Sequence, residues 1–401
     1  MKKNILFVME SMKSGGGEKS LLTLLQLFDY SRYNVDLMLF NPSGLFFDMI
    51  PPKVNIVPIG GEYGTFSQPV VSSMKGFLAK GKISLAIGRV LYSRAVNSGK
   101  GSSLQRDQHS WKYMRAAMPA PQKKYDAAIG YLEGKPNFFV ADCVEAKVKI
   151  AYIHNDYRKL QLDPEFDKKI FDKMDFVVTV SDECKTVLEN IFANSKEKIR
   201  VVHNITSAEI LEKMSEKIPE EFIEKPNKKI LLTVGRISQQ KGYDIAIDAA
   251  EILHKKGYDF KWFSIGKGEL REELEQRIKE KNLQEKFVFL GERANPYPYI
   301  AGCDIYVQSS YYEGKSIAID ESKCLAKPIV ATKFTTVYDQ LRDGETALLS
   351  EIDAMSVAEK IEQLLCDEAL AKKLEENLKK EKHGNEEEIK KFYALLGEKN
   401  G

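Results

Sequence analysis

Three residues with phosphate-binding chemistry, Gly314, Lys315 and Ser316, stand together in the second half of the chain. The same residue types end the P-loop of nucleoside triphosphatases, whose pattern G-x-x-x-x-G-K-[ST] also requires an earlier glycine. That position is Ser309, and bulky tyrosines follow it, so the P-loop interpretation is rejected. The alternative is a helix that begins here and offers the free backbone amides of Lys315 and Ser316 to a phosphate.

Two carboxylates, Glu313 and Glu321, flank this segment. If residues 316–326 form a helix, Glu321 shares its apolar face with Ile317 and Cys324. A carboxylate on that side must be hydrogen-bonded, and a pair of ribose hydroxyls is a fitting partner. The chain has 58 acidic residues, so the spacing of the two glutamates alone also arises by chance.

Two cations stand in the loop Gly235–Gly242, which follows an apolar run. Arg236 and Lys241 lie on the approach to a predicted helix, an arrangement suited to a diphosphate. A surface loop with two ordinary cations would have the same spacing.

Glycines also follow the first apolar run, at Gly15, Gly16 and Gly17. A glycine turn that leads into a helix lets a ligand approach backbone amides, although a tight turn alone would also explain it. His154 ends another apolar run and is a candidate site residue, with a structural role as the alternative. No His, Asp or Glu cluster has metal-ligand spacing, so we expect no metal and no other cofactor.

These candidates follow strands in an alternating pattern of strands and helices, which predicts an α/β protein with parallel sheets covered on both faces. The predicted strands cover residues 4–10, 33–40, 125–132, 148–154, 176–181, 198–204, 229–236, 259–266, 286–291, 304–310 and 328–332. Ligands bind at the carboxyl ends of such strands.

The pattern is interrupted once, so we expect two Rossmann-like, doubly wound domains that face one another across a cleft. Residues 1–205 form the first domain, with an insertion at 60–123. The polar segment 206–229, which contains two prolines, is expected to be an interdomain linker. Residues 230–380 form the second domain, and a helix in 381–401 is expected to cross back onto the first.

The insertion is strongly basic. Residues 63–106 contain seven Lys or Arg and no Asp or Glu, with apolar residues between them. This composition suits an anionic membrane surface, and the alternative is a helical insertion with a solvated face.

The overall composition is that of a soluble globular protein, with 43% hydrophobic and 29% charged residues. A net charge of +2 gives no argument for nucleic acid, and none is expected as a partner. The five scattered cysteines suggest neither disulfides nor zinc, and a reduced cytosol fits them. The first apolar run is too short for a signal peptide, and no stretch is long enough to span a membrane.

In their order and spacing, these motifs resemble glycosyltransferase family 4. The similarity runs from about residue 4 to 350 and is densest in 230–350, which contains "LLTVGRISQQKG" and "YYEGKSIAIDESK". The resemblance implies the GT-B fold and a retaining, metal-independent hexosyltransferase. The substrates would be a nucleotide-sugar donor, with UDP-sugars favoured, and a glycan or lipid-linked acceptor. The resemblance also implies that the acceptor enters mainly from the first domain, residues 1–205.

The resemblance also implies roles for the candidate residues. Arg236 and Lys241 would bind the donor diphosphate, Glu313 the donor sugar and Glu321 the ribose. The loop Gly15–Gly17 would close over sugar and diphosphate, and His154 would contact the transferred sugar.

This sequence departs from the family pattern at Lys315, where an apolar or aromatic residue is usual, and at residues 322–324. A cation at 315 would add a phosphate contact or recognise an acidic sugar. The expected setting is surface polysaccharide synthesis in the cytoplasm, on the inner face of the plasma membrane. A nucleotide-sugar epimerase of the same fold and a non-catalytic nucleotide-sugar-binding protein remain as alternatives.

Overall fold

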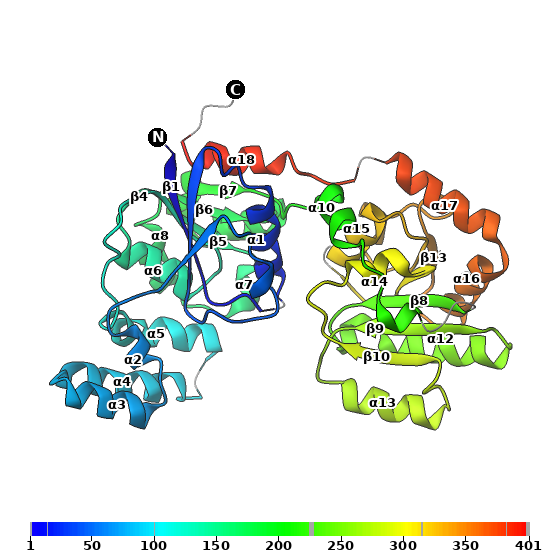
Figure 1. The fold of residues 1–401 in the computed structure, drawn as a ribbon, viewed down its shortest axis with the longest axis horizontal. Coiled ribbons are helices and arrows are strands. Elements are labelled where there is room, and N and C mark those ends of the chain that lie inside the picture. The colour runs from blue at the N-terminus through cyan, green and yellow to red at the C-terminus, as the bar shows by residue number, and fades with distance from the viewer. Residues whose placement is uncertain are drawn as a thin grey trace. The chain divides into compact units, whose positions relative to one another are not determined.

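The computed structural model describes residues 2–13, 15–99, 101–223, 228–313, 316–381 and 383–397. The chain forms two compact units (Figure 1). Unit 1 comprises Met1–Ile205 together with Glu386–Gly401, and unit 2 comprises Thr206–Asn385.

Unit 1 is built on a seven-stranded sheet in which all neighbouring strands run parallel. Its strands, in spatial order, are β3 (Val54–Val57), β2 (Tyr33–Leu39), β1 (Lys3–Met9), β4 (Tyr125–Gly130), β5 (Ala146–Ile153), β6 (Phe176–Thr179) and β7 (Ile199–Val201). Alternate residues of β1 enter two different cores: Ile5 and Phe7 face one, and Leu6 and Val8 face the other. Both faces of the sheet are therefore covered, which explains why its strands are continuous apolar runs.

Helices cover both faces of this sheet. Those of unit 1 are α1 (Gly16–Leu27), α2 (Tyr63–Phe66), α3 (Val70–Ala79), α4 (Ile83–Val96), α5 (Ser103–Arg115), α6 (Lys135–Cys143), α7 (Tyr157–Leu160), α8 (Pro164–Phe171), α9 (Asp182–Ile191) and α18 (Glu388–Leu395), with short 3-10 turns at η1 (Phe47–Met49) and η2 (Ala193–Lys198). The basic insertion is thus helical, formed by α2 to α5.

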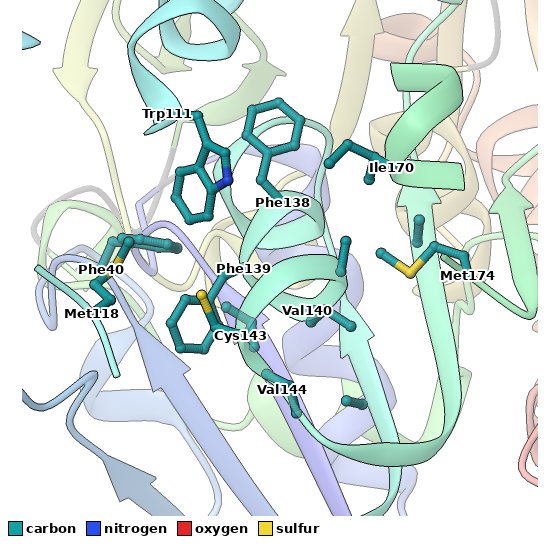
Figure 2. Close-up of a cluster of buried hydrophobic side chains, with 14 of the residues drawn as sticks. Phe40, Trp111, Met118, Phe138, Phe139, Val140, Cys143, Val144, Ile170 and Met174 are labelled. Atoms are coloured by element: carbon teal, nitrogen blue, oxygen red, sulfur yellow. The ribbon is translucent and has the colours of Figure 1, made fainter. Parts of the chain in front are cut away.

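Helix α6 is central to one of the two cores (Figure 2). Phe138, Phe139 and Val140 are fully buried on it, and the ring of Trp111 from α5 packs edge-on against Phe138 at 5.7 Å. The indole Nε1 of Trp111 donates to Asp142 at 2.8 Å. These contacts attach the helical insertion to the layer that covers the sheet.

Unit 2 has a six-stranded parallel sheet. Its strands, in spatial order, are β10 (Phe287–Gly291), β9 (Phe260–Ile265), β8 (Lys229–Val234), β11 (Ile305–Gln308), β12 (Ile329–Thr332) and β13 (Leu348–Ser350). Its helices are α10 (Ala208–Met214), α11 (Glu220–Ile223), α12 (Tyr243–Lys255), α13 (Arg271–Glu280), α14 (Tyr297–Gly302), α15 (Ile317–Cys324), α16 (Ala354–Cys366) and α17 (Glu368–Lys380), with 3-10 turns at η3 (Gln239–Lys241) and η4 (Val337–Asp339). Two buried clusters again cover the two faces.

The expectation of a linker at 206–229 is wrong for the described part of that segment. Helices α10 and α11 lie within it, and Leu211 and Phe222 are buried in the core of unit 2. The Phe222 ring packs against Phe263 at 5.3 Å. A few apolar side chains at helical spacing suffice to dock short helices whose other faces are charged, which is why the segment reads as polar.

The second connection between the units lies at Asn385. There the backbone N–H of Asn385 donates to the carbonyl of Thr206 at 3.0 Å, and the Asn385 side chain accepts from the N–H of Thr206 at 2.7 Å. After it, α18 packs on unit 1, where Phe392 stacks on Phe7 with ring centroids 5.9 Å apart.

Candidate active site

The order of the strands marks one place in each sheet where the chain reverses its direction of winding. In unit 1 this switch point lies between β1 and β4, and in unit 2 between β8 and β11. In open parallel sheets, ligands bind at the carboxyl edge of the sheet, next to such a switch point. The candidate residues predicted from the sequence lie on the loops after the strands at the switch points, or close to them.

In unit 2, the loops after β8 and β11 are held against each other. The N–H of Tyr311 donates to the carbonyl of Gln240 at 2.9 Å, and the Ser309 hydroxyl donates to the carbonyl of Lys241 at 3.0 Å. Gly242 has a φ of +61°, and a Cβ there would lie 2.0 Å from the carbonyl oxygen of Ser309. Only glycine fits this approach, so the glycine that ends the "GRISQQKG" motif fixes the distance between the two loops.

The contact between the loops brings Lys241 and Glu313 together. The Lys241 Nζ lies 2.6 Å from Glu313 Oε1, and only 6% of the glutamate side chain and 17% of the lysine side chain are exposed. Two neutral donors share the same carboxylate oxygen, Gln308 Nε2 at 2.9 Å and Ser310 Oγ at 2.7 Å. Lys241 is therefore a cation neutralised by a buried carboxylate, a pairing that no motif in the sequence indicates.

Arg236 differs from Lys241. Its side chain is exposed, and no hydrogen bond or ion pair of its guanidinium occurs within the described ranges. The loop after β8 thus presents one exposed, unpaired cation and one held by Glu313.

The expected phosphate site at Ser316 is wrong in one respect. The Ser316 N–H donates to Gln340 Oε1 at 2.9 Å, and Gln340 Nε2 donates back to the carbonyl of Ser316 at 2.9 Å. The Ser316 hydroxyl caps α15 by accepting from the N–H of Ile319 at 3.4 Å. The side chain of Gln340, 24 residues downstream, thus accepts a hydrogen bond from the Ser316 amide that we expected to be free. Gly314 and Lys315 lie outside the described residues.

Glu321 is buried on α15, with 3% of its surface exposed. The Tyr297 hydroxyl donates to its Oε1 at 3.2 Å. Burial raises the pKa of Tyr297 well above its usual value, and the carboxylate of Glu321 raises it further, so the phenol remains a donor. The apolar face was predicted only in part, because Ile317 is exposed whereas Ile319 is buried.

In unit 1, the glycines at the start of α1 and His154 are neighbours: Gly15 is the N-cap of the helix, and Gly16 and Gly17 are its first residues. A Cβ on Gly17 would lie 2.8 Å from a methyl group of Leu132 and 3.8 Å from the His154 ring. One on Gly15 would collide with the carboxylate of Glu18, at 2.2 Å, whereas Gly16 is exposed with open space around it. Burial raises the pKa of Glu18, and the carboxylates of Glu10 and Glu133 add to this effect.

His154 has one bonded and one unbonded ring nitrogen. Its Nε2 lies 3.0 Å from the carbonyl oxygen of Tyr131, so the neutral ring carries its hydrogen there and donates it. Its Nδ1 is buried and has no partner among the described residues. Burial lowers the pKa of His154, and the opposing effect of Glu133 is smaller, so the ring is a neutral acceptor at Nδ1.

Two contributors had no signal that we used in the sequence. Glu133 follows β4 and accepts from the backbone N–H of His154 at 3.1 Å and from the side chain of Asn155. Gln340, on the loop after η4, belongs to no motif. A polar residue just after a predicted strand could have pointed to Glu133, whereas nothing local marks Gln340. No group of three His, Cys, Asp or Glu side chains suited to a metal occurs in the part of the chain that the structure describes.

A family model matches the part of the chain that contains the site of unit 2. The family model described as "Glycosyl transferases group 1" matches residues 214–381, which contain β8, β11 and α15. This part of the chain is thus similar to the group 1 glycosyltransferases. The group 1 region thus contains Arg236, Lys241, Glu313 and Glu321.

A curated relative matches over a longer stretch than the group 1 region. The Campylobacter jejuni "N-acetylgalactosamine-N,N'-diacetylbacillosaminyl-diphospho-undecaprenol 4-alpha-N-acetylgalactosaminyltransferase" is 29% identical over 240 residues, which cover 59% of this chain and 63% of the relative. The chain covers less than two thirds of the length of the curated relatives that it matches first.

Solved structures extend the likeness to the whole fold. Staphylococcus aureus TarM, in complex with fondaparinux, alpha-GlcNAc-glycerol and UDP, matches 99% of this chain and 100% of its own with a TM-score of 0.62 at 14% identity. Anabaena HepE in complex with UDP-glucose matches 94% of this chain and 93% of its own, with a TM-score of 0.58 at 18% identity. Both units thus have the fold of the two-domain GT-B glycosyltransferases. None of the described helices is long and apolar enough to cross a membrane.

Proposed function

We propose that this chain is a retaining glycosyltransferase that moves a hexose from a nucleotide-diphosphate donor, with UDP-sugars favoured, to a hydroxyl of a glycan or a lipid-linked oligosaccharide. The observation that carries the proposal is the buried pair of Lys241 and Glu313 beside the exposed Arg236 at the switch point of unit 2. A buried carboxylate and two cations at this edge suit a ligand that combines a sugar with a diphosphate.

The pair suggests how the donor enters. A diphosphate that reaches the loop after β8 meets Arg236 first and then competes with Glu313 for the ammonium of Lys241. Glu313 stays in place during this exchange, because Gln308 and Ser310 continue to donate to its carboxylate. Its oxygens then become acceptors for hydroxyls of the donor sugar.

The chemistry follows from these charges. The bond between the anomeric carbon and the diphosphate oxygen breaks, and the acceptor oxygen bonds to the same face of that carbon. The departing phosphate takes the proton of the acceptor. Arg236 and Lys241 stabilise the negative charge that develops on the leaving group, a role that a metal ion fills in other enzymes, so we propose a metal-independent reaction. Removing one such donor typically costs about 3 kcal/mol of transition-state stabilisation.

The remaining candidates bind and orient. Glu321, held by Tyr297, would accept from the ribose hydroxyls. In unit 1, the bare Nδ1 of His154 would accept from a hydroxyl of the transferred sugar, and the loop Gly15–Gly17 would let that sugar approach the backbone.

The partners of similar proteins support this assignment. TarM and HepE were solved with UDP or UDP-glucose, and the name of the Campylobacter relative describes transfer to a diphospho-undecaprenol carrier. We propose that this chain works in surface polysaccharide synthesis at the cytoplasmic face of the plasma membrane. Its third partner would be an anionic membrane surface.

Calorimetry with UDP tests the donor site. Arg236→Ala and Lys241→Ala should each weaken UDP binding at least about tenfold, and Glu321→Gln should do the same while circular dichroism shows an intact fold. Lys229→Ala is the matched control, because Lys229 lies at the amino end of the same strand, β8. Unchanged affinity in the Lys241 variant would refute the diphosphate assignment.

A product assay tests the reaction. With donor and acceptor together, the chain should form a glycoside in which the anomeric configuration of the donor is kept, and chelation of metal ions should not slow it. An altered sugar released from the donor alone would identify an epimerase. Binding without turnover, across a panel of nucleotide sugars and acceptors, would identify a binding protein.

A further inference from the structure

Helices α3 and α4 carry an exposed apolar surface that the proposed transfer reaction does not use. Five large apolar side chains on them, between 36% and 67% exposed, are Val71, Leu78, Ile83, Ile87 and Leu91. Ile83, Ile87 and Leu91 follow one another at four-residue intervals on α4. Val71 and Leu78 lie seven residues apart on α3, about two turns, so each helix presents its apolar side chains as one stripe. The two helices lie side by side at the outer edge of unit 1 (Figure 1).

The opposite faces of the same helices hold the fold together. Phe77 of α3 and Ala86 of α4 are buried in the core of unit 1. Arg89 of α4 is also buried, and its guanidinium donates to the carbonyls of Phe66 at 2.8 Å and Gln68 at 3.0 Å. The inner faces of α3 and α4 therefore pack in the core, whereas the stripes on their outer faces stay exposed among the described residues of unit 1.

The charges around the stripes are positive. Lys75 lies between Val71 and Leu78 on α3, Arg94 continues the stripe of α4, and both side chains are exposed. Fewer cations are available on this surface than the sequence suggested. The Arg89 guanidinium is buried and bonded to backbone carbonyls, and Lys80 and Lys82 form ion pairs with Glu62 at 2.8 and 2.6 Å. These two bonds hold the pKa of Glu62 at about 2.

We propose that the outer face of α3 and α4 lies flat on an anionic lipid bilayer, with its five apolar side chains among the acyl chains and Lys75 and Arg94 at the phosphates. Helices of 10 and 14 residues cannot span a membrane but can lie in its interface. The proposal rests on the proposed function for its setting, since a lipid-linked acceptor would be met at that surface.

The positive charge around the stripes favours an anionic lipid surface, rather than a second copy of the chain, as the partner of α3 and α4. Two such faces brought together would oppose lysine and arginine with cations of the same sign, and residues 63–106 offer no acidic side chain to pair with them. A bilayer with anionic headgroups supplies both the negative charge and the apolar layer.

Sedimentation with vesicles of phosphatidylcholine and phosphatidylglycerol tests this surface. The full chain should bind at low salt, less at high salt, and weakly to vesicles of phosphatidylcholine alone. Ile83→Ser combined with Ile87→Ser should reduce the partition coefficient at least about tenfold, since two inserted aliphatic side chains are lost. Lys75→Glu combined with Arg94→Glu should abolish the salt-sensitive part. Ile218→Ser is the matched control, because Ile218 of unit 2 is 71% exposed outside this surface and should bind as the wild type does.

Several outcomes would overturn the proposal. These are no binding to anionic vesicles at low salt, equal binding by the isoleucine variant, or a wild-type dimer that this variant dissociates. A vesicle-binding defect with unchanged UDP affinity and unchanged transfer to a soluble acceptor supports the proposal. Failure of UDP binding in the wild type would instead count against the proposed function and leave the vesicle result to stand by itself.

Discussion

Lys241 and Glu313 form a buried ion pair, in which each side chain neutralises the charge of the other. Changing one partner should therefore alter what the other can bind. Glu313→Gln removes the negative partner but keeps a polar side chain of the same size for Gln308 and Ser310 to contact. The ammonium of Lys241 is then available to a diphosphate without competition. We expect UDP affinity to be unchanged or up to about tenfold higher, while turnover falls at least about tenfold.

Calorimetry and a transfer assay on the same preparation check this prediction. Weaker UDP binding by Glu313→Gln would mean that the pair organises the loop rather than withholding a cation. Lys241→Ala provides the comparison, since both affinity and turnover should fall in that variant.

His154 links burial to the pH dependence of stability. Its pKa is lowered in the folded protein, so below about pH 6.5 the unfolded chain takes up a proton that the folded chain does not. The contribution of the neutral His154 ring to the free energy of unfolding is fully present above the ordinary pKa of histidine. It decreases as the pH falls toward the lower pKa that the ring has in the folded protein. Its loss reaches at most about 1.4 kcal/mol per pH unit.

Urea unfolding between pH 7 and pH 5 measures this effect. In His154→Gln, whose amide can still donate to the carbonyl of Tyr131, the free energy of unfolding should decrease less steeply with falling pH than in the wild type. Equal slopes in the two proteins would show that other groups carry the pH dependence.

The residues that the sequence predicted are those that sit on short motifs after strands. Arg236, Lys241 and Glu313 were found because their loops follow apolar runs, and adjacent parallel strands then bring such loops together. Gln340 was missed because its contact with Ser316 depends on how the chain returns after β12, which no local pattern contains. The burial of the Lys241–Glu313 pair was missed for the same reason.

At the scale of elements, Gly242 sets the contact between the loops after β8 and β11. Gly242→Ala forces a left-handed backbone on an alanine, at roughly 1–2 kcal/mol, and adds a collision with the Ser309 carbonyl. Gly257→Ala is a matched control, because Gly257 also has a positive φ, +86°, but has open space around it. Chemical unfolding should show a larger loss for Gly242→Ala, and its UDP affinity should fall, whereas that of the control should not. Equal losses would mean that the loops can separate without cost.

The sequence predicts the central strands of both sheets correctly but misses two edge strands and two short helices. All eleven predicted runs are strands of the two sheets, whereas the edge strands β3 and β13 were missed. These are four and three residues long, too short to stand out as apolar runs. The sequence pattern predicts a linker where α10 and α11 lie, because only the few residues of these helices that face the core are apolar.

At the scale of the whole molecule, the last helix belongs to the first unit, which makes the stability of unit 1 depend on the end of the chain. Phe392 is fully buried in a cluster with Phe7 and Phe28, at centroid distances of 5.9 and 6.1 Å. Phe392→Ala leaves a cavity there and should cost about 3–5 kcal/mol of the unfolding free energy of unit 1. Lys390→Ala, an exposed change on the same helix, should cost little.

Hydrogen exchange resolves which unit is affected. In Phe392→Ala, the amides of β1, β2 and α1 should exchange faster, whereas those of β8, β9 and α12 should keep their protection, because the described residues that form the cluster around Phe392 all belong to unit 1. UDP should still bind, since Arg236 and Lys241 belong to unit 2. Equal acceleration of exchange in both units would show instead that the two units unfold together as one cooperative unit. The stability of unit 2 would then depend on Phe392 as much as that of unit 1 does.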